Sequence, residues 1–267
     1  MSDDKAARLA AIRAKNAANQ PAAAAVAPAS ALAPAVVDHR PPAAHDEDIP
    51  AIAGASVIAL LLAVALGALA AAVALPRWLP GLSASLLGDH PTAFWYLSRS
   101  SAMVSYALVW LSMVLGLSLT GRIARLWPGG PTALDMHQHA SILGLAFGLF
   151  HALILLGDRY IDYSLRSVLV PFASAGYKPL WVGLGQLSLY GFALVTLSFY
   201  VKKWIGRRAW RIIHYASFLL FLTVLAHGAA SGSDTSRPLI SGFYWATGGS
   251  VVFLTAYRIL VRLKSKG

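Results

Sequence analysis

The chain has 267 residues, of which 57% are hydrophobic and 12% charged, and its formal net charge is +11. This apolar composition argues against a water-soluble globular domain. The absence of cysteine excludes disulfides, iron–sulfur clusters, thiolate haem ligation and thiol catalysis. No nucleic-acid partner is expected, because membrane topology and anionic lipid account for the basic charge.

Residues 1–48 form an arm rich in alanine and proline, with mixed charges and little to bury. This composition predicts a disordered segment, which the charge distribution described below assigns to the cytoplasm. Within it, Lys5–Lys15 is predicted to be a solvated tail or, alternatively, a short surface helix.

Six charge-free windows follow the arm. A hydrocarbon core about 30 Å thick requires about 20 apolar residues at about 1.5 Å each, and uninterrupted segments in lipid satisfy their backbone groups as helices. The first window starts too far into the chain, and is too long, to be a signal peptide. The sequence therefore predicts an all-α, integral membrane six-helix bundle over residues 49–267. The windows are Ile49–Leu75, Ser100–Gly121, Met136–Gly157, Pro179–Val201, Ile212–Ser233 and Pro238–Tyr257, the last helix continuing to about residue 260.

The basic residues between these windows are distributed unequally. Of the 22 Lys and Arg, 16 lie on the side that includes both termini and six lie on the other. The positive-inside rule therefore predicts that both termini are cytoplasmic. Two apolar pieces on the outer side, Trp78–Leu87 and Ser167–Gly176, are too short to span a bilayer and are expected to lie in the interface.

Five of the eight histidines fall in the third and fifth windows. An ionisable side chain at membrane depth is costly and marks a functional site in the bundle interior by default. The alternative is that these histidines are satisfied by polar groups of other helices. The five are His137, His139, His151, His214 and His227, while His39, His45 and His90 lie in the arm and an outer loop.

In the third window, His137 and His151 are fourteen residues apart, which places them about 40° apart in azimuth and about 21 Å apart in depth. Between them on the same stripe lie Ser141, Gly144 and Gly148. These small residues predict a groove for a cofactor or, equally, the close helix approach that Gly-xxx-Gly allows.

In the fifth window, His214 and His227 are thirteen residues apart. Because the two windows run in the same direction, His137 matches His214 in depth and His151 matches His227. Two depth-matched pairs are what two stacked bis-imidazole haems require. Thirteen residues of ideal helix rotate the second histidine about 140° away from the first. If both are ligands, we expect a distortion over residues 217–226, and a regular helix there would count against the outer haem.

His139 competes with His137 as a ligand. It lies twelve residues from His151 and therefore about 120° off its face, which favours His137. His139 is expected to bond a neighbour or a haem propionate instead.

The histidine spacings of fourteen and thirteen, with the run Phe94–Ala102 that opens the second helix, resemble the ferric reductase-like transmembrane domain family over about residues 90–262. This superfamily includes NADPH oxidase membrane cores and the haem-binding subunit of the periplasmic methionine sulfoxide reductase system. The resemblance implies haem b held by His137 with His214 and by His151 with His227, in a bacterial inner membrane.

The same resemblance places Arg99 near the outer haem, where it would contact a propionate or steady negative charge on an acceptor. A snorkelling interfacial arginine is the alternative. Arg207, Arg208 and Arg211 would hold the inner propionates, or they only follow the positive-inside rule.

No glycine-rich FAD or NADPH module follows the sixth helix, so electrons are expected from a quinol or a cytoplasmic flavin reductase. The expected acceptor is a redox partner protein on the outer face. The chain is thus predicted to be a b-type cytochrome, the electron-transfer component of an oxidoreductase.

Three alternatives remain at this point. The first is a single haem with a quinone near the vacated place. The second is a self-contained metalloreductase that reduces ferric iron or oxygen at the outer face. The third is a haem-free transporter or structural bundle, in which the histidines serve protons or packing.

Overall fold

The computed structural model of the chain describes residues 50–78, 80, 81, 84, 93–120, 123–158 and 161–264. The predicted arm, including Lys5–Lys15, lies outside these residues, as does most of Trp78–Leu87. Throughout the described part the regular elements are helical, and six spans are long and apolar enough to cross a membrane. For these residues, the prediction of an all-α fold with six helices long and apolar enough to cross a membrane is confirmed.

The first span runs from Gly54 to Trp78 and contains α2 (Gly54–Leu69), a π-helical turn (Ala70–Ala74) and α3 (Leu75–Trp78). It packs against α6 (Gly130–Ile154). Three leucine and isoleucine side chains on α2 are more than half exposed, namely Ile58, Leu62 and Leu66. Their four-residue spacing forms an apolar stripe on the face turned away from the protein, as lipid contact requires.

The second and third spans are α5 (Ala93–Thr120) and α6, which ends in a 3-10 turn over Leu155–Gly157. A second 3-10 turn, Ile123–Arg125, lies between them. Gly129 precedes α6 with φ of 103°, a conformation that favours glycine, and a proline occupies the first turn of α6, where its missing N–H costs nothing.

The remaining elements are the short α7 (Leu165–Leu169) and the spans α8 (Pro179–Ser198), α9 (Lys202–Ser231) and α10 (Pro238–Lys264). Helices α9 and α10 extend past the charge-free windows into their basic ends. A charge-free window identifies the part of a helix that lipid surrounds, whereas the hydrogen-bonded helix continues into the polar interface.

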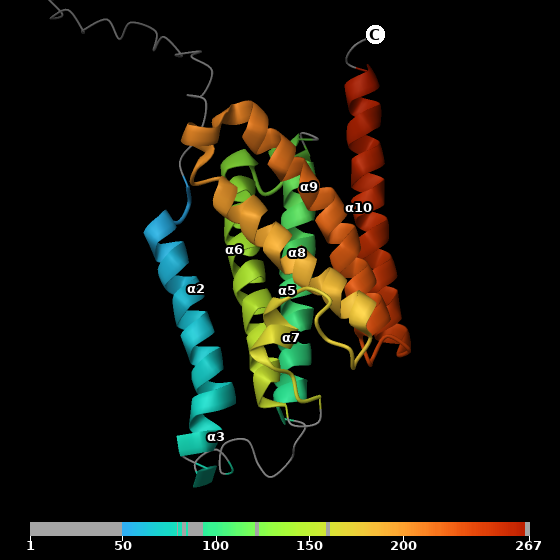
Figure 1. The fold of residues 1–267 in the computed structure, drawn as a ribbon. Helices are drawn as coiled ribbons and strands as arrows, with labels where there is room; N and C mark the ends of the chain where they lie inside the picture. The colour runs from blue at the N-terminus through green and yellow to red at the C-terminus, as the bar shows by residue number, and fades with distance from the viewer. Residues whose placement is uncertain are drawn as a thin grey trace, which may run out of the picture. The chain divides into compact units, whose positions relative to one another are not determined.

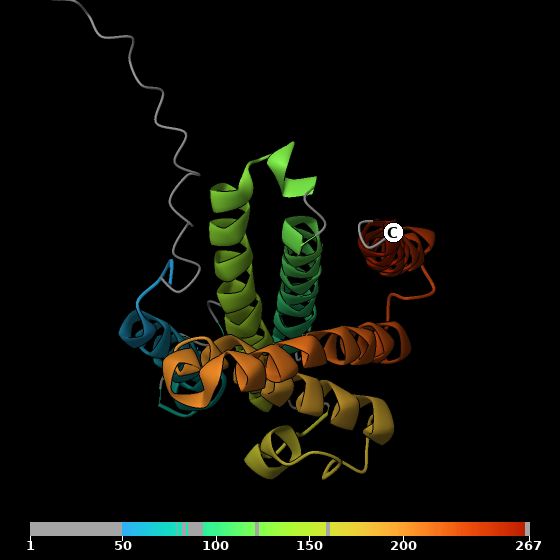
Figure 2. The same cartoon turned by 90° about the horizontal axis from the view of Figure 1, so that it is seen from above.

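Helices α5 and α6 run side by side in opposite directions, and α8 and α9 pack together and cross them obliquely (Figures 1 and 2). Helix α10 packs against α5 and α9. Between α5, α9 and α10 lies a buried cluster that includes Tyr106, Val109, Phe221 and Val251. Tyr106 and Phe221 stack with ring centroids 6.2 Å apart.

Large apolar side chains also cover the outer faces of the spans, including Leu194 on α8 and Phe253 on α10, at 60% and 67% exposure. Six apolar helices with apolar outer faces indicate a multi-pass membrane protein. The piece Ser167–Gly176 includes the end of α7 and exposes Leu169 and Phe172. Its location in the interface stays a prediction.

Candidate functional site

Four histidines of α6 and α9 face each other in two pairs. The ring centroids of His137 and His214 are 6.1 Å apart with planes at 72°, and those of His151 and His227 are 6.3 Å apart with planes at 66°. Ring nitrogens that face each other at such separations lie about 4 Å apart, which is too long for a hydrogen bond and about twice an imidazole–metal bond.

Helix α9 reaches both partners without the distortion expected over residues 217–226. It is regular there, and its one non-helical residue is Gly206, with φ of 82° and ψ of 155°, eight residues before His214. The predicted distortion is therefore wrong. Helix α9 crosses α6 obliquely, so the face of α9 that is turned toward α6 differs between the two ends of α9 (Figures 1 and 2). His214 and His227 can therefore both point toward α6 although they lie on different faces of α9.

The tautomers of the His151 and His227 rings follow from their hydrogen bonds. Nδ1 of His151 lies 2.9 Å from the carbonyl oxygen of Ser98, and Nδ1 of His227 lies 2.8 Å from that of Trp181. Because a carbonyl oxygen only accepts, each Nδ1 carries the proton and donates it. Each Nε2 then keeps a free lone pair, as a metal-ligating imidazole requires.

The other pair is held differently on its two sides. His137 donates its Nδ1–H to the carbonyl oxygen of Ser112 at 2.8 Å. On α9, the Trp210 ring stacks on His214 with centroids 5.1 Å apart and planes at 24°. The ammonium of buried Lys202 lies 4.5 Å from the centre of the Trp210 ring, so Trp210 also makes a cation–π contact.

Glycines of neighbouring helices leave room for two of the rings. A Cβ at Gly185 of α8 would lie 2.6 Å from Cε1 and Nδ1 of His227, and a Cβ at Gly116 of α5 would lie 3.3 Å from Cε1 of His137. The His227 ring can therefore occupy its position only because Gly185 has no side chain.

His139 lies outside both pairs. It is exposed, and its Nδ1–H bonds the carbonyl oxygen of Asp135 in its own helix at 2.8 Å. The ring that faces His214 is that of His137.

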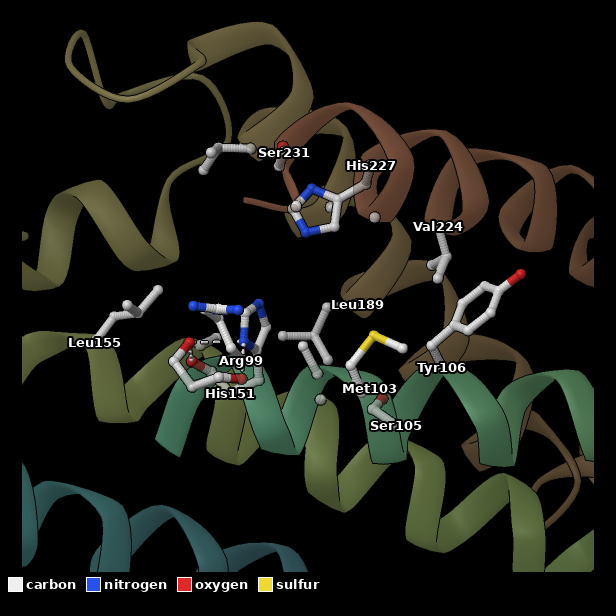
Figure 3. A pocket seen from close by; sticks show the side chains of 18 of the residues that line it. Arg99, Met103, Ser105, Tyr106, His151, Leu155, Leu189, Val224, His227 and Ser231 are labelled. Atoms are coloured by element: carbon white, nitrogen blue, oxygen red, sulfur yellow. Dashed lines mark hydrogen bonds between the residues drawn. The ribbon is translucent and has the colours of Figure 1, made fainter. Parts of the chain in front are cut away.

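A cavity of about 350 Å³ surrounds the His151–His227 pair between α5, α6, α8, α9 and α10. In Figure 3, His227 points from α9 into this cavity, with His151 and Arg99 on the opposite wall. Apolar side chains dominate the lining of this cavity. The labelled apolar residues are Met103, Leu155, Leu189 and Val224, with Ser105, Tyr106 and Ser231 as polar or amphipathic neighbours.

Gly144 and Gly148 line the cavity and also bring α6 close to α5. A Cβ at Gly144 would lie 3.1 Å from Cγ2 of Val109, and one at Gly148 would lie 3.2 Å from Oγ of Ser105. At these two positions the same glycines both line a cavity and allow α6 to pack closely against α5.

Arg99 lines the cavity and forms an ion pair with Asp234, between α9 and α10. Asp234 also accepts from Nε of Arg237 at 3.2 Å. The side chains of Arg99 and Asp234 are 29% and 28% exposed, and both residues line the cavity. The guanidinium is therefore within the same pocket as His151 and His227, and it already has a carboxylate partner.

The basic residues implied for the inner pair are not part of this cavity. Arg207, Arg208 and Arg211 are exposed on the first turns of α9. Their contact with a propionate stays a prediction.

Two buried polar atoms on the cavity wall have no hydrogen-bond partner among the described residues. They are the hydroxyl oxygens of Tyr163 and Ser231. An unpaired buried hydroxyl costs free energy, so these atoms favour a ligand that carries polar groups of its own.

Sequence reasoning missed the residues that orient the rings. Helix α5 carries serines at intervals of seven residues, at Ser98, Ser105 and Ser112. This period places them on one face of the helix and could have identified them from the sequence. No comparable signal marked Trp181 or Gly185, because their contacts with His227 depend on how α8 packs against α9.

Among the described residues, no group of three or more His, Cys, Asp and Glu could hold a metal ion. Comparison with known proteins identifies no relative, since no family model, curated protein or solved structure matches the chain.

Proposed function

We propose that this chain is a membrane-bound b-type cytochrome that carries electrons across the bilayer. It holds two haem b groups between α6 and α9, one on His137 and His214 and the other on His151 and His227. The observation that supports this proposal most directly is the near-equal separation of the two ring pairs, 6.1 and 6.3 Å between centroids.

That separation agrees with two imidazoles that would bind one metal ion. A metal–imidazole bond is about 2 Å long. A five-membered ring with bonds of about 1.33 Å has its centre about 1.1 Å from each atom. Two such bonds and two such radii in line place the ring centres about 6.2 Å apart. Both pairs are thus spaced to bind iron with little rearrangement.

The wall of the cavity is compatible with a haem at the His151–His227 pair. The apolar lining suits the macrocycle, while Arg99 and the unpartnered hydroxyls of Tyr163 and Ser231 suit its carboxylates. Haem requires only two ligands from protein, the number that each ring pair offers.

The residues of the chain have separate tasks in this proposal. His151 and His227 bind through Nε2, while the carbonyl groups of Ser98 and Trp181 hold their tautomers. The largely apolar lining would lower the local dielectric constant around a bound haem. Bound haem iron supplies reversible one-electron chemistry, and the protein sets its potential through these contacts.

The two pairs would serve opposite halves of the membrane. Fourteen residues of α6 separate His137 from His151, which corresponds to about 21 Å along the helix. With basic residues concentrated at the His137–His214 end, the positive-inside rule assigns that end to the cytoplasm of a bacterium and the other to the outer face. Electrons would come from a quinol or a cytoplasmic flavin reductase and leave to a redox partner protein at the outer face.

The decisive experiment is a dithionite-reduced minus oxidised spectrum of the purified chain, with haem quantified per protein. Two haems are expected, and His151→Ala and His227→Ala should each remove about half. His139→Ala is the matched control from α6 and should keep the full content. A spectrum without a b-type band would refute the proposal in favour of a haem-free bundle. An unchanged spectrum in both variants would refute the second haem.

A further inference from the structure

One face of α5 carries three serines at intervals of seven, and each bonds α6. Ser98 meets His151, Ser105 donates to the carbonyl oxygen of Gly144 at 2.7 Å, and Ser112 meets His137. The partners on α6 also recur every seven residues, in the reverse order. A single antiparallel register therefore places one serine at each of the two histidines of α6 and the third serine midway between them.

Ser98 contacts His151 through both its carbonyl and its hydroxyl group. The ring Nδ1 lies 2.9 Å from the Ser98 carbonyl oxygen and 2.8 Å from Oγ, and the same hydroxyl donates to the His151 carbonyl at 3.1 Å. The side-chain hydrogen is used in that last bond, so Oγ is an acceptor for Nδ1–H. The ring proton is thus shared between two oxygens of one residue, which is 1% exposed.

Ser112 repeats this arrangement at the other end of α5. The His137 Nδ1 lies 2.8 Å from the Ser112 carbonyl oxygen and 3.0 Å from its Oγ. The hydroxyl of Ser112 also bonds Ser141 Oγ at 2.7 Å, and Ser141 donates to the His137 carbonyl at 2.7 Å. At both ends, therefore, a buried serine contributes two acceptors to the nitrogen opposite the ligating one.

We infer that Ser98 and Ser112 are positioning residues that set how strongly His151 and His137 bind their metal, each for its own site. The inference rests on the proposed haem function. Acceptors at Nδ1–H make Nε2 a stronger donor, and a stronger donor favours the oxidised metal and lowers its reduction potential. Ser105 has the same position in the heptad but bonds only a backbone carbonyl, so its hydroxyl has no such effect.

The test compares Ser98→Ala, Ser112→Ala and the control Ser118→Ala by redox titration of the purified chain with its haem. Each alanine keeps the backbone carbonyl and removes only the hydroxyl. Ser98→Ala should raise the potential of the haem that His151→Ala eliminates, and Ser112→Ala should raise that of the other. Haem affinity at the altered site should fall about 10-fold or more. Ser118→Ala, in the same helix but outside the cavity lining, is the control and should leave both potentials unchanged.

Ser98→Thr retains a hydroxyl and should restore the wild-type potential, which separates the hydrogen bond from general loss of packing. Equal shifts in all three alanine variants, or no shift in Ser98→Ala and Ser112→Ala, would overturn the inference while the two-haem spectrum still supports the proposed function. A wild-type chain without a b-type band would refute both.

Discussion

Gly185→Ala offers a quantitative test of the His151–His227 site. The new Cβ would lie 2.6 Å from Cε1 and Nδ1 of His227, whereas ordinary contact begins at 3.4 Å, so the ring must move by at least 0.8 Å. Metal–ligand distances tolerate only about 0.2 Å. The substitution should therefore remove the haem at this pair and about half of the total haem, although alanine is the better helix former.

Gly116→Ala is the matched control at the other pair. Its Cβ would lie 3.3 Å from Cε1 of His137, which requires a shift of only 0.1 Å, and haem content should stay at the wild-type value. Gly191→Ala controls for crowding within α8, since the three atoms nearest its methyl group belong to the flexible side chain of Leu220 and not to a histidine. For all three variants, the haem content per protein is measured as the pyridine haemochromogen. A Gly185→Ala chain with two haems and a wild-type spectrum would refute the placement of the His227 ring.

Three further outcomes follow from other contacts. Asp234→Asn removes the partly exposed ion pair with Arg99, so it should lower the free energy of unfolding by at most about 1 kcal/mol, measured by denaturant titration. Tyr106→Phe removes the 2.5 Å hydrogen bond to Thr247 in the buried cluster and should cost about 1 kcal/mol in the same assay; no change would show that this bond adds nothing to stability. The chain has no cysteine, so Ser236→Cys, next to the predicted outer end of α10, should react with a membrane-impermeant maleimide on intact cells. Labelling only after permeabilisation would reverse the predicted topology.

The six spans could be predicted from the sequence because a bilayer imposes a minimum apolar length on each helix. The choice of His137 over His139 used only the rotation per residue of a regular helix, which the protein preserves in α6. The same calculation wrongly predicted a distortion in α9. Rotation per residue describes the faces of one helix, whereas the angle at which α9 crosses α6 depends on side-chain packing between helices. Asp234 was equally out of reach, since its pairing with Arg99 joins segments 135 residues apart.

The shared register of α5 and α6 makes this helix pair sensitive to changes in length. A single residue inserted into α5 between Ser98 and Ser112 would turn everything beyond it by about 100° and advance it by about 1.5 Å. One serine would then lose its histidine while the other kept it. Insertions and deletions within this stretch should therefore uncouple the two ends of the protein, and length variation belongs in the connections outside it.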